Sequence, residues 1–165
     1  LLRAVASVVE SGYNVRLVLA GGVGISKADK HLSPIVTHYQ LQDRVDFLGA
    51  VDDIDEFFSR VDLFLLISWS EGFPTVLGEA MGRNLPCIAS NVGDSRILLG
   101  DPGQLVAPGD IDQLIVAIRL FLEMSVDERK AIGTRNRIRI QHRFSKEKML
   151  GRYDMVYKYA TKNSC

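Results

Sequence analysis

The sequence has few cysteines, no long apolar run and no net charge. Each of these absences argues against a class of protein. Its two cysteines, Cys87 and Cys165, are far apart and lack the spacing of a metal site or a redox pair. That usage fits a reducing, cytoplasmic setting. No apolar run approaches the roughly 20 residues that span a bilayer. Twenty basic and twenty acidic residues cancel, so we expect no nucleic-acid partner.

Length and pattern predict one α/β domain over residues 1–165. A chain of 165 residues with 47% hydrophobic content can bury one substantial core. Strand-like and helix-like stretches alternate, which predicts a Rossmann-like parallel sheet of about five strands with helices on both faces. The strands are expected at residues 15–20, 45–48, 63–67, 87–89 and 105–106. Helices are expected at 1–10, from about 26 to 41, at 54–58, 74–83, 110–122 and 127–143, and after Ser145.

The most informative run lies between the third and fourth of these strands. It carries Glu71 and Glu79 on either side of a Gly-Phe-Pro turn. Pro74 suits the first helical position, where its missing N–H would be unpaired in any case. The free N–H groups of Thr75, Val76 and Leu77 would then favour an anion such as phosphate at the helix start.

Two glycines accompany Glu79 in the same predicted helix. Thr75, Gly78, Glu79 and Gly82 share one face by their three- and four-residue spacing. Each helical glycine costs on the order of 1 kcal/mol relative to alanine. Glycine at two such positions indicates a face left bare so that a ligand can approach it.

Four glycine-containing turns follow predicted strands. They are Gly21-Gly22, Gly49, the turn at residues 68–74 and the loop at residues 91–94. In parallel sheets, ligands bind beyond the carboxyl ends of the strands, so we expect these turns to surround one crevice. Gly21-Gly22 alone lacks a full dinucleotide-binding pattern, and a simple turn and a direct phosphate contact both remain open.

Other constellations have local structural explanations. Two Asp-x-Asp triplets, at residues 53–55 and 110–112, fall at predicted helix starts, where aspartate caps the helix. We therefore expect no metal site. The basic residues of the helix at 127–143 are expected to form a solvated face, with contact to an anionic membrane surface as the alternative.

The run around Glu71 resembles the E-x7-E signature of retaining glycosyltransferases of family 4, which have the GT-B fold. Residues 61–68, 85–94 and 104–110 resemble the strands and turns that flank this signature in the family. The resemblance covers nearly the whole chain but only the C-terminal, donor-binding half of such an enzyme. It implies that the first strand of this half, with the Arg and Lys that usually follow it, and the N-terminal acceptor domain are absent. Asn84 replaces the usual glycine and is expected to end the helix in the same way.

The resemblance also implies roles for single residues. Glu71 would contact the donor sugar near the reacting centre and is the catalytic candidate, while Glu79 would bind the ribose hydroxyls. The base would pack near Gly49 and Val51. Gly21 and Gly22 are further nucleotide-binding candidates, on the weaker evidence of their turn. The backbone that would hold the sugar and diphosphate comprises Gly72, Phe73, Pro74, Thr75, Val76 and Leu77. No cofactor other than the nucleotide-sugar substrate is expected.

These observations predict the donor-binding domain of a retaining glycosyltransferase that acts on a glycan or lipid-linked acceptor, as in surface polysaccharide biosynthesis. The alternatives are a non-catalytic nucleotide-sugar-binding module and a related sugar-nucleotide epimerase. The full enzyme is expected in the cytoplasm, with peripheral contact to the inner face of the membrane as an option. Without the first strand, a neighbouring strand is expected to have an exposed edge.

Overall fold

Helices and strands alternate along most of the chain in the computed structural model, which describes residues 1–22 and 30–162. The elements are, in chain order, α1 (Leu2–Glu10), β1 (Leu17–Ala20), α2 (Leu32–His38), β2 (Val45–Gly49), α3 (Ile54–Ser59), β3 (Phe64–Leu66), α4 (Thr75–Gly82), β4 (Cys87–Ser90), α5 (Ser95–Leu99), a 3-10 turn (Pro102–Gln104), β5 (Leu105–Val106), α6 (Ile111–Glu123), α7 (Val126–Arg143) and α8 (Lys146–Lys162).

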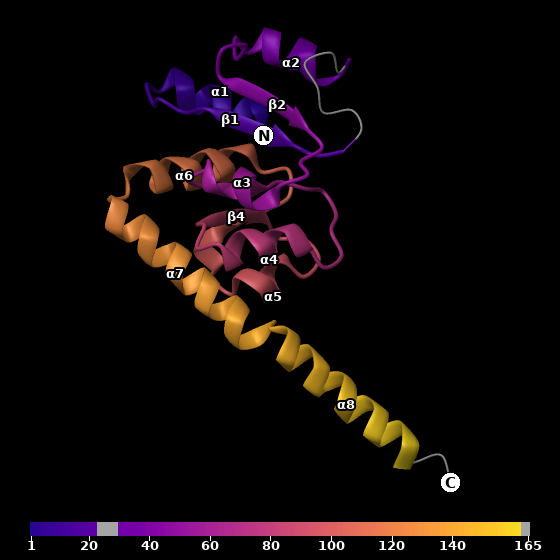
Figure 1. Ribbon diagram of the computed structural model, residues 1–165. Helices are drawn as coiled ribbons and strands as arrows, with labels where there is room; N and C mark the ends of the chain where they lie inside the picture. The colour runs from indigo at the N-terminus through magenta and orange to yellow at the C-terminus, as the bar shows by residue number, and fades with distance from the viewer. Residues whose placement is uncertain (23–29, 163–165) are drawn as a thin grey trace.

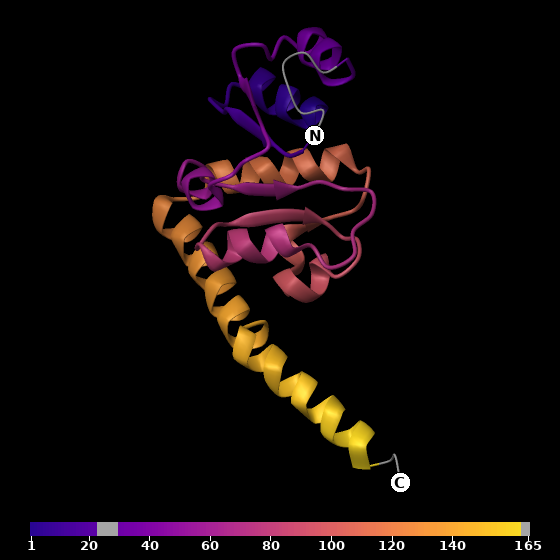
Figure 2. The ribbon, with the colours of Figure 1, turned by 45° about the vertical axis from the view of Figure 1, so that its right-hand side comes forward.

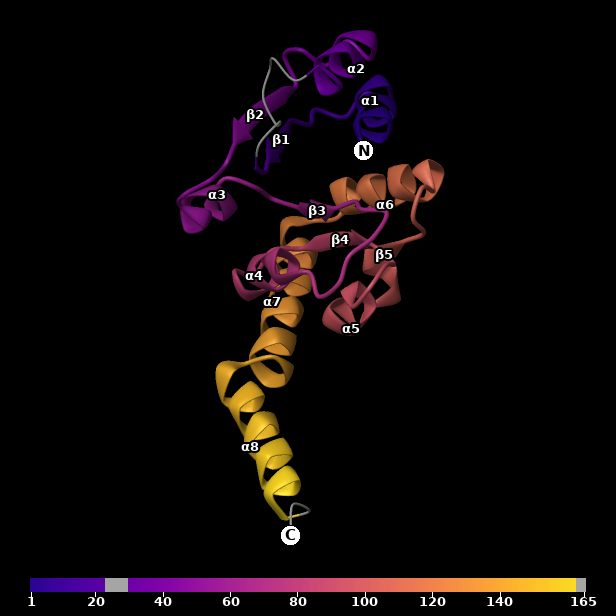
Figure 3. The same ribbon diagram turned by 90° about the vertical axis from the view of Figure 1, so that its right-hand side faces the viewer.

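The five described strands pair in parallel, which confirms the predicted α/β class, but they form two sheets. β1 pairs with β2, with Leu17 opposite Val45. β3, β4 and β5 form the second sheet in that order, with Phe64 opposite Cys87. Figure 3 shows the β1–β2 pair above the three-stranded sheet. In the described part of the chain no strand joins β1 to β3, so each of these two strands has one edge without a partner strand.

Helices cover both faces of the three-stranded sheet, as predicted. In Figure 2, α6 lies on one side of the β3–β4 pair, and α4 and α5 lie on the other. Every residue of β4 is buried, as expected for a strand with helices on both faces. Cys87 and Ala89 pack with α3, α4 and α5, whereas Ile88 packs with α1 and α6. Burial raises the pKa of the Cys87 thiol.

Helix α1 bridges the two sheets. Its Leu2 and Val5 pack with the core of β1, β2 and α2. Its Ala4 and Val8 pack instead with Ile118 of α6 and with the three-stranded sheet. One amphipathic helix therefore holds both sheets together.

The bounds of the helices agree with the sequence predictions in some places and differ in others. The long helix predicted from about residue 26 is the short α2, because residues 30 and 31 form a turn, and positions 26–29 lie outside the described residues. Helix α5 was not predicted, because its five residues are too few to show a helical period. Asn84 has φ 61° just beyond α4, which confirms it as the helix stop.

The C-terminal helices extend away from the sheets (Figure 1). α7 begins with a capping box between Ser125 and Glu128 and packs against α4, where Gly133 lies against the Asn84 carbonyl. Large apolar side chains of α8 are exposed, with Tyr153 and Tyr157 accessible by 57% and 68%. Within residues 1–22 and 30–162, no helix combines the length and the apolarity that crossing a bilayer requires.

Candidate active site

Glu71 lies in the loop between β3 and α4, where two serines fix its position. The Ser68 hydroxyl donates a 2.7 Å hydrogen bond to Glu71 Oε1. The Ser68 N–H in turn donates to Oγ of Ser90 at 3.1 Å, and Ser90 is 1% exposed at the end of β4. A partly buried carboxylate is thus tied through a short side chain to a fully buried strand.

The loop after β4 packs directly on this turn. Asp94 N–H donates to the Gly72 carbonyl at 3.0 Å. Gly93 has φ 50°, and a Cβ there would lie 2.3 Å from the Glu71 carbonyl oxygen. Only glycine allows so close an approach at this φ. Two of the four turns expected to surround the crevice are therefore in contact.

Helix α4 starts beside Glu71 with two unpaired N–H groups. Pro74 is the cap rather than the first helical residue, with ψ 90°. The N–H of Leu77 donates to the Pro74 carbonyl at 3.1 Å, so the prediction that it is free was wrong. Among described residues no acceptor is present for the N–H groups of Thr75 and Val76. These two donors and the helix dipole remain available to an anion.

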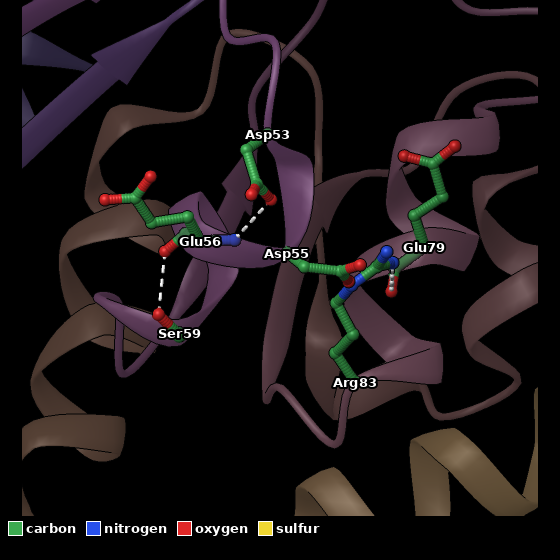
Figure 4. A network of polar contacts seen from close by, with 6 residues as sticks. All are labelled: Asp53, Asp55, Glu56, Ser59, Glu79 and Arg83. Carbon is green, nitrogen blue, oxygen red and sulfur yellow. Dashed lines mark hydrogen bonds and ion pairs between the residues drawn. The ribbon is translucent and has the colours of Figure 1, made fainter.

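Glu79 is exposed near the middle of α4. Arg83 forms an ion pair with Asp55 and donates to the Glu79 carbonyl oxygen at 3.1 Å. The Glu79 carboxylate points away from Arg83 (Figure 4) and makes no hydrogen bond or ion pair with the described residues. Its acceptor oxygens are thus available to hydroxyl groups of a ligand.

The two glycines of α4 have different surroundings. A Cβ on Gly78 would lie 3.8 Å from Ile140 Cδ1, so Gly78 faces α7. Gly82 follows it by one turn of the helix and has open space around it. The prediction of a bare face therefore fails at Gly78, which is directed at α7, and stays a prediction at Gly82.

The other two predicted turns meet each other across β1 and β2. Gly21 N–H donates to the Gly49 carbonyl at 2.8 Å, and Gly49 has φ 66°. Gly21, Gly22, Val51 and also Val76 of α4 line one cavity of about 1050 Å³. Glu71 and Glu79 do not line it. The glycine turns thus form two contacting pairs, and only Val76 links the region of the E-x7-E run to the cavity.

Two aromatic side chains flank the turn that carries Glu71. Phe73 is half exposed, and its ring lies 6.0 Å from that of Phe144 at the end of α7. Trp69 is 81% exposed and covers Gly109, where a Cβ would lie 2.5 Å from the indole ring. Trp69 therefore presents an open aromatic face beside Glu71.

The first aspartate of each Asp-x-Asp triplet caps a helix. Asp53 accepts from Glu56 N–H at 2.8 Å and caps α3 (Figure 4), and Asp110 caps α6 by accepting from Gln113 N–H at 2.8 Å. The Gln113 side chain does not complete a capping box with Asp110, because it accepts from Ala107 N–H instead. In the described residues, no three His, Cys, Asp or Glu side chains lie close enough together to hold a metal ion.

Sequence reasoning missed Ser68 and Gly93 as positioning residues. Ser68 lies three residues before Glu71, and this spacing is the signal that could have revealed its hydrogen bond. Gly93 acts through a contact between two loops, which no local pattern in the sequence indicates.

Comparison with known proteins identifies a family and a curated relative. A family model described as "Glycosyl transferases group 1" matches residues 1–139. N-acetyl-alpha-D-glucosaminyl L-malate synthase of Bacillus anthracis is 34% identical over 126 residues, which are 74% of this chain and 32% of that protein. The chain thus spans about a third of the length of this relative.

Solved structures share the fold. Sucrose-phosphate synthase from Thermosynechococcus elongatus is 26% identical, with a TM-score of 0.84 over 99% of this chain and 43% of that one. HepE of Anabaena, in complex with UDP and glucose, is 25% identical, with a TM-score of 0.83 over 96% of this chain and 43% of that one. From the match of residues 1–139 to the family model, together with these relatives, the chain belongs to the group 1 glycosyl transferases, which have the GT-B fold.

Proposed function

We propose that this chain is the donor-binding domain of a retaining glycosyltransferase. The whole enzyme would transfer a sugar from a nucleotide-sugar to a glycan or lipid-linked acceptor held by an N-terminal domain of the same polypeptide. The observation that carries the proposal is the placement of Glu71. Ser68 holds this carboxylate next to the start of α4, where the N–H groups of Thr75 and Val76 are unpaired.

The arrangement suits a donor that has three chemically distinct parts. An anionic carboxylate is a strong acceptor for hydroxyl groups, so Glu71 would bind hydroxyls of the sugar and Glu79 those of the ribose. The diphosphate would lie at the start of α4, together with backbone groups of residues 72–77. The base would pack near Gly49 and Val51, with Gly21 and Gly22 beside it. The complex of HepE with UDP and glucose supports a donor of this kind.

The chemistry that follows is a substitution at the anomeric carbon of the sugar. The bond from that carbon to the diphosphate breaks, and the diphosphate leaves with the electron pair. A bond to the oxygen of an acceptor hydroxyl forms, and the departing diphosphate takes up the hydroxyl proton. Negative charge develops on the leaving group, so preorganised N–H donors and the α4 dipole would stabilise the transition state more than the ground state. No metal is part of this proposal.

Family membership also supports a proposal for the setting of the whole enzyme. We place it in the cytoplasm, in the assembly of surface polysaccharide or glycolipid. Contact with the inner face of a membrane is an option for the basic residues of α7.

Calorimetry with matched ligand pairs tests the proposal. Residues 1–165 are titrated with nucleoside diphosphates and with the corresponding nucleotide-sugars, starting with UDP and UDP-glucose. Saturable binding of one nucleotide-sugar, tighter than that of its diphosphate, is expected. Failure of every pair to bind this chain and a longer gene product would contradict it. Binding by the longer protein without transfer to any acceptor would favour the non-catalytic module.

A further inference from the structure

Trp69 is an exposed aromatic side chain that nevertheless has a fixed position. It is the only tryptophan of the chain, and it is 81% exposed, whereas tryptophan is highly buried on average in folded proteins. Its far edge contacts Gly109, where a Cβ would lie 2.5 Å from Cη2 and 2.9 Å from Cζ3 of the indole. The two faces of the ring are therefore largely open to solvent.

Both ends of this side chain are held by ordered backbone. Ser68, directly before Trp69, donates one hydrogen bond through its N–H and another through its hydroxyl. Gly109 has φ 80° and lies in a turn that the Asp110 N–H closes by donating to the Ala107 carbonyl at 3.1 Å. An aromatic ring between two fixed turns is preorganised, so a ligand loses little binding energy to the ordering of this side chain.

Packing alone does not account for this exposed ring. Stabilisation by burial is roughly proportional to the apolar area removed from water, and 81% of Trp69 stays accessible. Contact with the ring also requires glycine at position 109, since a side chain there would overlap the indole. A large flat apolar surface held in the open is typical of a ligand-binding contact.

The indole crosses the carboxyl end of β4. The strands β3, β4 and β5 are parallel neighbours in that order, and the arrows of β3 and β4 end on the same side (Figure 2). Trp69 follows β3 and Gly109 follows β5, so the ring that joins them passes over the end of the middle strand. Asn91 is the first residue beyond β4. Its N–H donates to the Val106 carbonyl at 2.8 Å, while its exposed side chain makes no hydrogen bond with the described residues.

An indole face and a free amide together suit a sugar ring. One face of a pyranose carries C–H groups that can stack on an aromatic ring, and its edge carries hydroxyl groups. The amide of Asn91 offers donors and an acceptor to such hydroxyls. A few polar groups that converge on an apolar surface are typical of sites for small molecules.

The indole lies on the side of Glu71 away from the candidate nucleotide site. Gly21 and Gly49 lie at the ends of β1 and β2, and β3 is the strand that lines the cavity together with β1. The ring of Trp69 extends in the other direction, from the loop after β3 toward the loop after β5. A sugar stacked on it would be on the far side of the donor sugar from the nucleotide, which is the place of the acceptor.

We propose that Trp69 and Asn91 form a subsite for a sugar ring of the acceptor. This inference rests on the proposed function and deepens it, because it names the class of acceptor. The reacting hydroxyl belongs to a carbohydrate, and not to a bare lipid or a small organic acid. The donor sugar at Glu71 and the acceptor sugar at Trp69 would lie side by side at the carboxyl edge of the sheet.

Intrinsic fluorescence tests the proposal directly, because Trp69 is the sole tryptophan. Residues 1–165 are titrated, with and without saturating UDP, with the methyl glycosides of glucose, galactose, mannose and N-acetylglucosamine. We expect at least one glycoside to shift the emission saturably, with a dissociation constant on the order of millimolar for so small a ligand. UDP alone should leave the emission nearly unchanged.

Matched variants separate stacking from packing. Trp69→Leu keeps an apolar side chain without a flat ring, and Trp69→Phe keeps the ring. Ligand-observed NMR with the responding glycoside should show about tenfold lower affinity for Trp69→Leu, nearly normal affinity for Trp69→Phe, and about threefold lower affinity or less for Asn91→Ala. Calorimetry with the diphosphate and its nucleotide-sugar should give unchanged affinities for all three variants.

The proposal is overturned if no glycoside changes the emission of a chain that binds a nucleotide-sugar. It is also overturned if the nucleotide-sugar itself shifts the emission and Trp69→Leu lowers its affinity, because the indole would then contact the donor sugar. Equal shifts with octyl glucoside and octyl phosphate, and none with a methyl glycoside, would assign the ring to a lipid chain and overturn it as well. Absence of nucleotide binding contradicts the proposed function instead, and the glycoside titration without UDP still tests the sugar subsite.

Discussion

Ser68 and Glu71 form a 2.7 Å hydrogen bond in which the serine hydroxyl donates to the carboxylate. The bond holds a potential catalytic carboxylate on a loop, and the loop itself is fixed to the end of β4 through Ser90. Sites that work by charge placement need such support, because a misplaced acceptor loses most of its effect.

Removal of this support should affect the sugar end of the donor alone. Ser68→Ala removes the donor to Glu71, although water can replace it in part. We expect a net loss of about 0.5–1.5 kcal/mol in the free energy of binding, which is a roughly two- to tenfold lower affinity for the nucleotide-sugar. Calorimetry should show unchanged affinity for the free diphosphate, and Ser68→Thr should restore most of the loss. An equal loss for the diphosphate would show that Ser68 acts on the whole loop.

The contact between α7 and α4 gives a stability prediction with an internal control. A Cβ on Gly133 would lie 1.8 Å from the Asn84 carbonyl oxygen, whereas a Cβ on Gly82 would meet nothing within 4 Å. Gly133→Ala should therefore lower the free energy of unfolding by about 1–3 kcal/mol or more. Gly82→Ala should raise it by up to about 1 kcal/mol. Urea titration of both variants measures the difference, and a neutral Gly133→Ala would contradict the packing of α7 on α4.

The sequence predicted most elements because their signals are local. Continuous apolar runs identified the strands around Leu65 and Ile88, and the turn with Pro74 located α4. Pairing between strands depends on contacts far apart in the chain, so neither the division into two sheets nor the contact of Gly93 with Glu71 could be predicted. The same reason explains the wrong inference about Gly78, whose neighbour Ile140 belongs to a distant helix.

Donor binding should not require a divalent cation. The start of α4 would supply the electrostatic stabilisation that a metal ion supplies in other transferases. Calorimetry of the donor in excess chelator should give the same affinity as in magnesium or manganese. Loss of binding in chelator, with recovery on adding either metal, would refute this prediction and return attention to Asp53 and Asp55.

The chain by itself should bind a donor weakly and transfer nothing. Transfer requires an acceptor positioned at the anomeric carbon and exclusion of water, and both depend on a second domain that closes over the site. Residues 1–165 are incubated with a donor panel and candidate acceptors, and products are followed by mass spectrometry. Multiple turnovers by this chain would show that the proposed division between two domains is wrong.

The most direct test of the account compares Glu71→Gln and Glu79→Gln by calorimetry against a nucleoside diphosphate and its nucleotide-sugar. Loss of a hydrogen bond to a charged group costs about 1.5–3 kcal/mol, or roughly tenfold to more than a hundredfold in affinity. Glu79→Gln should lower the affinity for both ligands by such a factor. Glu71→Gln should lower the affinity for the nucleotide-sugar alone and leave the affinity for the diphosphate nearly unchanged. Equal losses for both ligands in both variants would contradict the assignment of Glu71 to the sugar and Glu79 to the ribose.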